Sequence, residues 1–256
     1  MEKNQINFTD ENGQLIPLEE IQKAIEEIYN EAKEHIENHE NNENNENNEN
    51  NEDNCDGSIL DTLTDPELQI NGENIINTLN FLERSLYLCD EIKLEHAIAF
   101  ADAIRFWNKV DELDEIPIED RIPIKIYIDS PGGDLDATFS IIDSIALSKT
   151  PIWTITIGCG CSGAFFIGIS GHRRFGYPHS SYLFHEGSAQ GGGDAHKYLQ
   201  GVKFYEKKLS MLRKITLKYT KLTEEDYKKH RKDDLWLTAE EALRYGVIDE
   251  ISNQII

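Results

Sequence analysis

One serine in this sequence lies where a nucleophile could act. Ser162 follows an uncharged apolar run and is surrounded by small residues, in the segment Gly158-Cys-Gly-Cys-Ser-Gly-Ala-Phe165. The glycines at 160 and 163 permit a close turn. A helix that begins at the serine would direct free N–H groups and a positive dipole at a developing oxyanion. A serine that only packs in the interior or caps the helix is the alternative interpretation.

Three further features carry groups that such a serine needs. The turn Asp129-Ser-Pro-Gly-Gly133 follows a β-branched strand and can present backbone N–H groups at the carboxyl edge of a parallel sheet. His185 ends another predicted strand, and Asp234 precedes an apolar triplet and a helix-capping sequence. A neutral imidazole can take the proton of a serine hydroxyl, and a carboxylate can orient that imidazole. Taken singly, each feature also has a structural explanation, as an ordinary turn, a hydrogen-bonding histidine or a solvated acid.

The elements predicted to hold these residues alternate between strands and helices. Strands are predicted over 86–89, 123–128, 152–158, 174–175 and 181–184. Helices are predicted over 94–110, 137–148, 162–169 and 195–219. The apolar stripe of the first of these helices includes Ala97, Ile98, Ala101, Ile104 and Trp107. Strands that alternate with helices imply crossover connections and a largely parallel sheet, so an α/β fold is expected.

The first part of the chain has a different character. Residues 17–39 are predicted to form an amphipathic helix, because a proline opens the segment and apolar residues recur every three or four positions. Glu-Asn-Asn repeats then continue to Glu52, and a tract with nothing to bury is expected to be disordered. The predicted organisation is an N-terminal helical appendage over 1–39, a disordered linker over 40–56 and a main domain over 57–256.

The charge and composition of the chain exclude several classes of function and location. The formal net charge of −23 argues against nucleic-acid binding, which needs a basic face. No signal peptide is expected, and the uncharged segment 150–171 is interpreted as a buried strand and helix, with no membrane span. The four cysteines match no zinc pattern and are expected to be reduced, buried thiols in a cytoplasmic protein.

The Pro-Gly-Gly turn, Ser162, His185 and Asp234 occur in an order and register that resembles the proteolytic subunit of Clp protease, the ClpP family. The similarity runs from about residue 83 to residue 251. It includes Thr238, four residues after Asp234, in the segment Thr-Ala-Glu-Glu-Ala-Leu-x-Tyr-Gly-Val-Ile-Asp. The resemblance implies a crotonase-like fold, built from repeated β-β-α units with a projecting handle helix.

The resemblance also implies a role for each of these residues. Ser162 would be the nucleophile, His185 the general base and Asp234 the carboxylate that orients the base. The backbone N–H groups of Gly133 and Gly163 would bind the oxyanion. This chemistry needs neither a metal nor an organic cofactor.

An assembly is implied as well. Residues 187–219 correspond to the family's handle, a strand and a long helix that join two rings. The positions expected to pack on this helix are Tyr198, Val202, Leu209, Leu212 and Ile215. The implied function is that of an ATP-dependent-type serine endopeptidase, which hydrolyses unfolded polypeptides inside a homo-oligomeric chamber. An AAA+ unfoldase is a candidate partner.

Three neighbours of the site depart from the family pattern. Gly163 stands where the family usually has Met, Glu186-Gly187 replaces Gln-Pro, and Asp233 replaces an Arg that couples ring contacts to the triad. These departures keep a second hypothesis open, in which the chain is a catalytically weak ring subunit or scaffold.

Other enzyme classes are less compatible with the sequence. A crotonase-type acyl-CoA enzyme shares the fold, but it binds CoA through basic residues, and these are few near the predicted cleft. An α/β-hydrolase has its triad in the order Ser, Asp, His, whereas the last histidine here, His230, lies in a charged stretch. A Ser–Lys dyad would leave His185 and Asp234 without a role.

Overall fold

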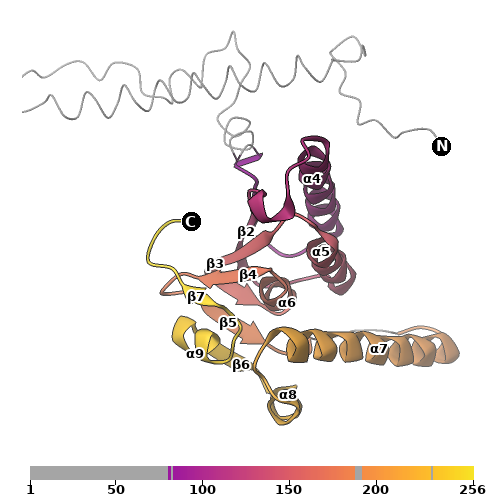
Figure 1. Ribbon diagram of the computed structural model, residues 1–256. Coiled ribbons are helices and arrows are strands. Elements are labelled where there is room, and N and C mark those ends of the chain that lie inside the picture. Colours follow the sequence, from indigo (N-terminus) through magenta and orange to yellow (C-terminus); the bar gives the residue numbers. More distant parts are fainter. Residues whose placement is uncertain (1–79, 82, 188–191, 232) are drawn as a thin grey trace, which may run out of the picture. The chain divides into compact units, whose positions relative to one another are not determined.

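The computed structural model describes residues 80–256, apart from residues 82, 188–191 and 232. The predicted helix over 17–39, the predicted linker and the first part of the predicted main domain lie outside the described residues. Within the described part, strands form one sheet, and helices pack against it (Figure 1). The predicted mixed α/β fold is therefore confirmed.

The sheet is largely parallel, as predicted. Its strands follow the order β1-β2-β3-β4-β7 with parallel pairing throughout. β5 pairs with the end of β3, also in parallel, and β6 pairs antiparallel with β5. No strand was predicted at β6 or β7. The bounds are β1 Ser85–Leu88, β2 Ile124–Ser130, β3 Ile152–Cys161, β4 Arg173–Gly176, β5 Ser181–Phe184, β6 Leu235–Thr238 and β7 Glu250–Ile251.

The predicted helices are present with small shifts at their ends. The bounds are α4 Leu94–Leu113, the short 3₁₀ turn η1 Ile118–Asp120, α5 Leu135–Leu147, α6 Gly163–Ile169, α7 Ala195–Tyr219, α8 Glu224–His230 and α9 Ala239–Arg244. α7 has the predicted bounds. α6 begins one residue later than predicted, because the backbone of Ser162 has φ 54°, which no α-helix contains.

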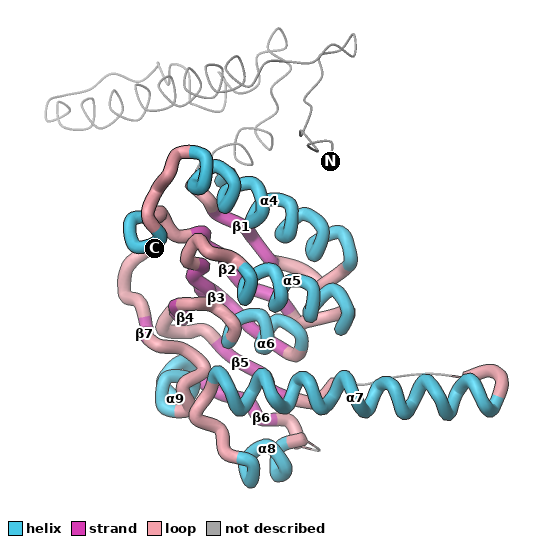
Figure 2. Tube along the Cα trace, turned by 45° about the vertical axis from the view of Figure 1, so that its right-hand side comes forward, coloured by secondary structure: helices cyan, strands magenta, loops and turns pink. Residues whose placement is uncertain are grey.

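Helices form a layer on one face of the sheet. α4, α5, α6 and α7 follow one another across this face, and α7 extends well past the rest of the domain (Figure 2). The core between the layers is rich in isoleucine and phenylalanine, with Ile126, Ile141 and Phe165 almost fully buried. The prediction for α4 was wrong at Ile98, which is 54% exposed, while Phe100 is buried.

The projecting helix α7 keeps much of its apolar surface exposed. Leu212 is buried, and Leu209 and Ile215 pack against the core as predicted. Tyr198 and Val202, the other predicted packing positions, are exposed in the single chain, so their predicted packing on another subunit stays a prediction. Further exposed apolar residues on the same helix are Leu199, Phe204 and Met211. Only the second half of α7 therefore packs on its own domain.

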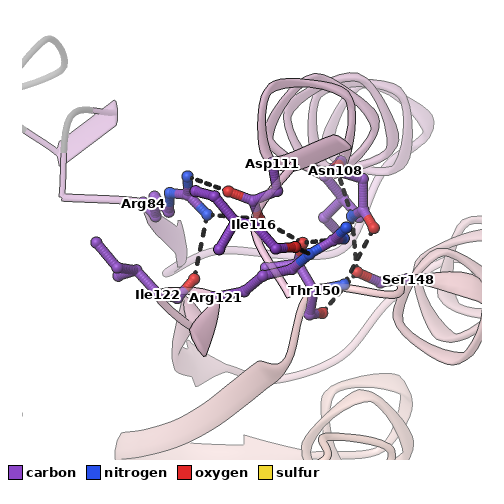
Figure 3. A network of polar contacts seen from close by, with 9 residues as sticks. Arg84, Asn108, Asp111, Ile116, Arg121, Ile122, Ser148 and Thr150 are labelled. Atoms are coloured by element: carbon purple, nitrogen blue, oxygen red, sulfur yellow. Dashed lines mark hydrogen bonds and ion pairs between the residues drawn. The ribbon is translucent and has the colours of Figure 1, made fainter. Parts of the chain in front are cut away.

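A buried polar network lies where the strands begin (Figure 3). The Asp111 carboxylate near the end of α4 is fully buried. It accepts hydrogen bonds from Arg84 Nη1 and Nη2 at 2.9 and 2.7 Å and from Thr150 Oγ1 at 2.6 Å. Arg121 Nη1 donates to Thr150 Oγ1 at 3.3 Å. The network joins α4 to the residues just before β1, β2 and β3, so it fixes the amino ends of these strands.

The prediction for the uncharged segment 150–171 is confirmed, whereas the prediction for the cysteines is confirmed only in part. The uncharged segment 150–171 contains β3 and α6, as interpreted, and none of the helices in the described ranges is long and apolar enough to cross a membrane. Of the cysteines expected to be buried, Cys161 is buried and Cys159 is partly buried, but Cys89 is exposed.

Candidate active site

Ser162 forms a sharp turn between a strand and a helix. β3 ends at Cys161 and α6 begins at Gly163, and between them Ser162 has φ 54° and ψ −121°. A positive φ is costly for a residue with a side chain, so the surrounding structure must hold it in place. The Ser162 N–H donates to the Leu183 carbonyl at 2.9 Å, and its carbonyl accepts from the Phe165 N–H at 3.0 Å. Hydrogen bonds on both sides thus fix the backbone.

The side chain of Ser162 does not serve the helix that it precedes. It makes no cap hydrogen bond to α6, and the residue is partly exposed. The alternative interpretation of Ser162 as a helix cap is therefore wrong. A strained backbone that presents an uncommitted hydroxyl is the arrangement expected of a nucleophile.

The glycine turn at the end of β2 packs directly against the Ser162 turn. Gly132 has φ 98°, and a β-carbon added to it would lie 2.6 Å from Ser162 Cβ and 2.8 Å from the Gly163 nitrogen. No side chain fits in so small a space. The turn is fixed by Ile92, whose N–H donates to the Gly132 carbonyl at 2.8 Å and whose carbonyl accepts from Asp134 N–H at 2.9 Å.

The two glycines whose amides are predicted to bind an oxyanion lie close together. A β-carbon added to Gly163 would be 3.5 Å from the Gly133 nitrogen. Gly163 is the first residue of α6, where backbone N–H groups have no partner inside the helix. The Gly133 N–H has no acceptor among the described residues. Both donors are therefore available to a ligand beside Ser162.

His185 and Asp234 meet because β5 and β6 are antiparallel neighbours. Phe184 pairs with Leu235, so the next residue of one strand and the preceding residue of the other face each other. His185 Nδ1 lies 3.7 Å from Asp234 Oδ1, an ion-pair distance that is too long for a hydrogen bond. His185 Nε2 is buried and has no hydrogen-bond partner among the described residues.

The structure thus brings the predicted residues to one edge of the sheet. Ser162 follows β3, the glycine turn follows β2, His185 follows β5 and Asp234 precedes β6. The contact between His185 and Asp234 is present, whereas no hydrogen bond joins His185 Nε2 to the serine. Hydrogen bonds of catalytic residues are commonly long without substrate and tighten when it binds.

The two thiols next to Ser162 are poor nucleophiles. Burial, the neighbouring Cys161 and Asp129 raise the pKa of the Cys159 thiol to about 12. Burial also raises the pKa of Cys161. Because a thiol reacts as its thiolate, both groups are unreactive near neutral pH. Among the side chains at this turn, the hydroxyl of Ser162 is the candidate nucleophile.

Sequence reasoning missed the residue that shapes the start of α6. A β-carbon on Gly163 would lie 2.5 Å from Thr138 Oγ1 and 3.0 Å from Ile92 Cδ1. Thr138 is fully buried in α5, and its hydroxyl donates to the Asp134 carbonyl at 2.7 Å. The absence of a side chain at 163, a departure from the family pattern, therefore has a packing reason. The buried threonine within an otherwise apolar helix face was the only sequence signal.

Comparison with known protein families identifies the domain. The family model described as Clp protease matches residues 71–254. The chain is 40% identical over 132 residues to ATP-dependent Clp protease proteolytic subunit 2 of Treponema denticola. This match covers 51% of this chain and 66% of that protein. It is 34% identical over 131 residues to the subunit of the same name from Treponema pallidum, with 50% and 66% covered. The match to subunit 2 of Cutibacterium acnes is 28% identical over 181 residues, with 70% and 81% covered. The chain thus spans just under two thirds of the length of the two Treponema relatives.

Proposed function

Because this chain belongs to the Clp protease family, we propose that it is a serine endopeptidase with Ser162 as nucleophile. The observation that carries the proposal is the Ser162 turn, which is strained, leaves the hydroxyl uncommitted and lies beside two available amides. A neighbouring His185–Asp234 contact supplies the base. The other proposed roles follow from this geometry.

Acylation begins with proton transfer from Ser162 to His185. The imidazole Nε2, which is buried and unpartnered, takes the hydroxyl proton as the oxygen attacks the carbonyl carbon of a peptide bond. His185 then gives this proton to the leaving amine, and an acyl group remains on the serine oxygen. A water molecule, deprotonated by the same imidazole, hydrolyses the ester and restores the hydroxyl.

The Gly133 and Gly163 amides stabilise the charge that forms in both steps. When the carbonyl carbon becomes tetrahedral, its oxygen carries a negative charge, and two N–H groups at fixed positions can donate to it. The amino end of α6 adds a favourable dipole. Removal of one such donor costs about 10²–10³ in rate in other serine peptidases.

Asp234 orients the base. Its carboxylate accepts the Nδ1–H of His185, so that Nε2 faces the serine without its proton, and it stabilises the imidazolium that forms. The present separation of 3.7 Å must shorten by about 0.5 Å or more to become a hydrogen bond. Closing of this contact on substrate binding is part of the proposal.

The proposed substrates are unfolded polypeptides, cut inside a homo-oligomeric ring. The exposed apolar side chains of α7 form a surface suited to burial in an interface, and the same apolar surface on a second copy of the helix could pack against it. The relatives are named as proteolytic subunits of an ATP-dependent protease, so an AAA+ unfoldase is the proposed partner. A cytoplasmic location stays a prediction.

The test is a comparison of the full chain with its Ser162→Ala variant. We expect the wild type to react with a fluorophosphonate probe and to hydrolyse an unfolded polypeptide, and the variant to do neither. Ser140→Ala, on the exposed side of α5, is the matched control and should behave as the wild type. Unchanged hydrolysis by the Ser162→Ala variant would refute the proposed mechanism.

A catalytically weak ring subunit is the second candidate. It is supported by the distance of 3.7 Å between His185 Nδ1 and Asp234 Oδ1, which is too long for a hydrogen bond. Failure of the wild type to react with the probe, together with an intact oligomer on size exclusion, would favour this candidate. The acyl-CoA alternative is not favoured by the family match.

A further inference from the structure

A second contact joins the segments that carry His185 and Asp234. Glu186 directly follows the histidine, and Arg231 directly follows α8 as its C-cap residue, three residues before the aspartate. Arg231 Nε lies 3.5 Å from Glu186 Oε2. This ion pair therefore connects the end of β5 to the chain that leads into β6, on the same side as the proposed base.

The Glu186 carboxylate lies in a sheltered position, where an unpaired charge is costly. Its side chain is 14% exposed. The neighbouring Tyr227 is buried, and its ring packs on Phe184 with 5.4 Å between centroids. Burial and the nearby Glu186 carboxylate raise the pKa of the Tyr227 hydroxyl above its usual value. Arg231 is the cation that contacts this carboxylate, so its loss leaves a poorly solvated charge unpaired.

Asp234, in contrast, is weakly held. Its side chain is 56% exposed, and its contact with His185 Nδ1 is 3.7 Å long. A carboxylate in water gains little from one distant ion pair. Its place beside the imidazole therefore depends on how the residues around it are held, by the pairing of Leu235 with Phe184 on one side and by the contact of Arg231 with Glu186 on the other.

We propose that the Glu186–Arg231 ion pair is a positioning element, which holds Arg231 against the end of β5 and so keeps Asp234, three residues further along the chain, beside His185. This inference rests on the proposed function, because it acts through the triad. It also assigns a role to Glu186, where the sequence departs from the family's Gln-Pro. Neither Glu186 nor Arg231 is a catalytic residue, since each acts through its neighbour in the triad.

The expected effect lies between a silent surface change and the loss of a triad member. Loss of the triad aspartate costs about 10⁴ in kcat in a well-studied serine protease. Misplacement of a catalytic group by about 1 Å costs up to about 10²-fold. Arg231→Gln should therefore lower kcat and the rate of fluorophosphonate labelling by about 10- to 100-fold. KM for a peptide substrate should stay within about twofold, because the pair does not touch substrate.

The experiment uses the full chain and four variants. Arg231→Gln and Glu186→Gln should both reduce labelling, and Arg231→Lys, which keeps the charge, should stay within about threefold of the wild type. Lys228→Gln is the matched control, because this cation lies on α8 three residues before Arg231 and its ion pair, at 3.7 Å, is with Glu224. Its labelling rate should equal that of the wild type.

A double-mutant cycle separates positioning from general damage. In an Asp234→Asn background the ion pair has no carboxylate to position, so adding Arg231→Gln should change the residual labelling rate by less than about twofold. An equal loss in both backgrounds would mean general damage and would overturn the inference. Wild-type labelling in Arg231→Gln would overturn it as well. A wild type that the probe does not label overturns the proposed function, and this inference with it.

Discussion

Substitution of Gly163 by Ala tests the packing around the proposed oxyanion site. The added β-carbon would lie 2.5 Å from Thr138 Oγ1, about 0.9 Å closer than the 3.4 Å at which ordinary contacts begin. Thr138 cannot easily retreat, because it is fully buried and its hydroxyl donates to the Asp134 carbonyl at 2.7 Å. The start of α6 must therefore shift by several tenths of an ångström, and the Gly163 amide shifts with it.

The expected magnitude follows from these contacts. Overpacking of a close-packed interior costs about 1–3 kcal/mol in the free energy of unfolding. A displaced oxyanion donor lowers kcat/KM by at least about tenfold, with about 10²–10³ as the upper limit when the donor is lost. Urea unfolding measures the first quantity, and peptide hydrolysis together with fluorophosphonate labelling measures the second.

Two companion variants make the result decisive. Thr138→Ala removes the clashing oxygen, so the double variant Gly163→Ala/Thr138→Ala should recover activity relative to Gly163→Ala alone. Gly168→Ala adds the same methyl group to the same helix, where the nearest atoms are 3.7 and 3.9 Å away, and should leave activity unchanged. The reasoning is refuted if Gly163→Ala is as stable and as active as the wild type, or if Thr138→Ala restores nothing.

Three further predictions concern stability. Asp111→Ala should lower the free energy of unfolding by about 3–5 kcal/mol, measured in urea, because Arg84 loses a fully buried partner. Burial alone would raise the pKa of Asp111, but hydrogen bonds from Arg84 and Thr150 and the charges of Arg84 and Arg121 lower this pKa below its usual 3.8. The stability that Asp111 contributes is therefore present at neutral pH and should be lost as the pH falls below 3.8. Thr238→Ala should cost about 1 kcal/mol in thermal unfolding, because the Thr238 hydroxyl caps α9; an unchanged midpoint would contradict this. Tyr227→Phe should change stability by less than about 1 kcal/mol, since the buried hydroxyl makes no hydrogen bond of good geometry in the described part of the chain. A larger loss would show that it donates to the nearby Glu186 carboxylate.

Local sequence patterns predict a helix or strand of this fold well where residues next to that element determine where it begins and ends. α7 begins at Ala195 because the Asp194 side chain accepts from the first helical N–H groups, and the prediction has the same bounds. β3 is different, because it continues three residues past the predicted end, through Gly160, a residue type that disfavours a strand. Pairing of Cys159 and Cys161 with β5 extends the strand there. Such pairing joins distant segments, so the local sequence does not reveal it.

The candidate site was predicted as a set of residues, and its geometry was not. The resemblance supplied the roles, while spacing along the chain says nothing of why His185 and Asp234 meet across 48 intervening positions. That contact depends on the register of β5 with β6, and β6 was not predicted as a strand. The clash at Gly163 and the Glu186–Arg231 pair depend on distances between helices and strands, which a sequence pattern does not encode.

Two strained residues of this domain show how strain at a structural site differs from strain at a candidate catalytic site. Arg84 and Ser162 both have φ 54°. At Arg84 the backbone bonds to Phe81 and Lys125, and the side chain donates two hydrogen bonds to the buried Asp111 carboxylate at the amino ends of the strands. At Ser162 the backbone bonds to Leu183 and Phe165 and the tight contact with Gly132 hold the conformation, while the hydroxyl caps nothing. Strain at Arg84 needs no further explanation, because the side chain that it places makes a buried ion pair that stabilises the fold. Strain at Ser162 places a side chain that makes no hydrogen bond to α6, which favours a chemical role for its hydroxyl.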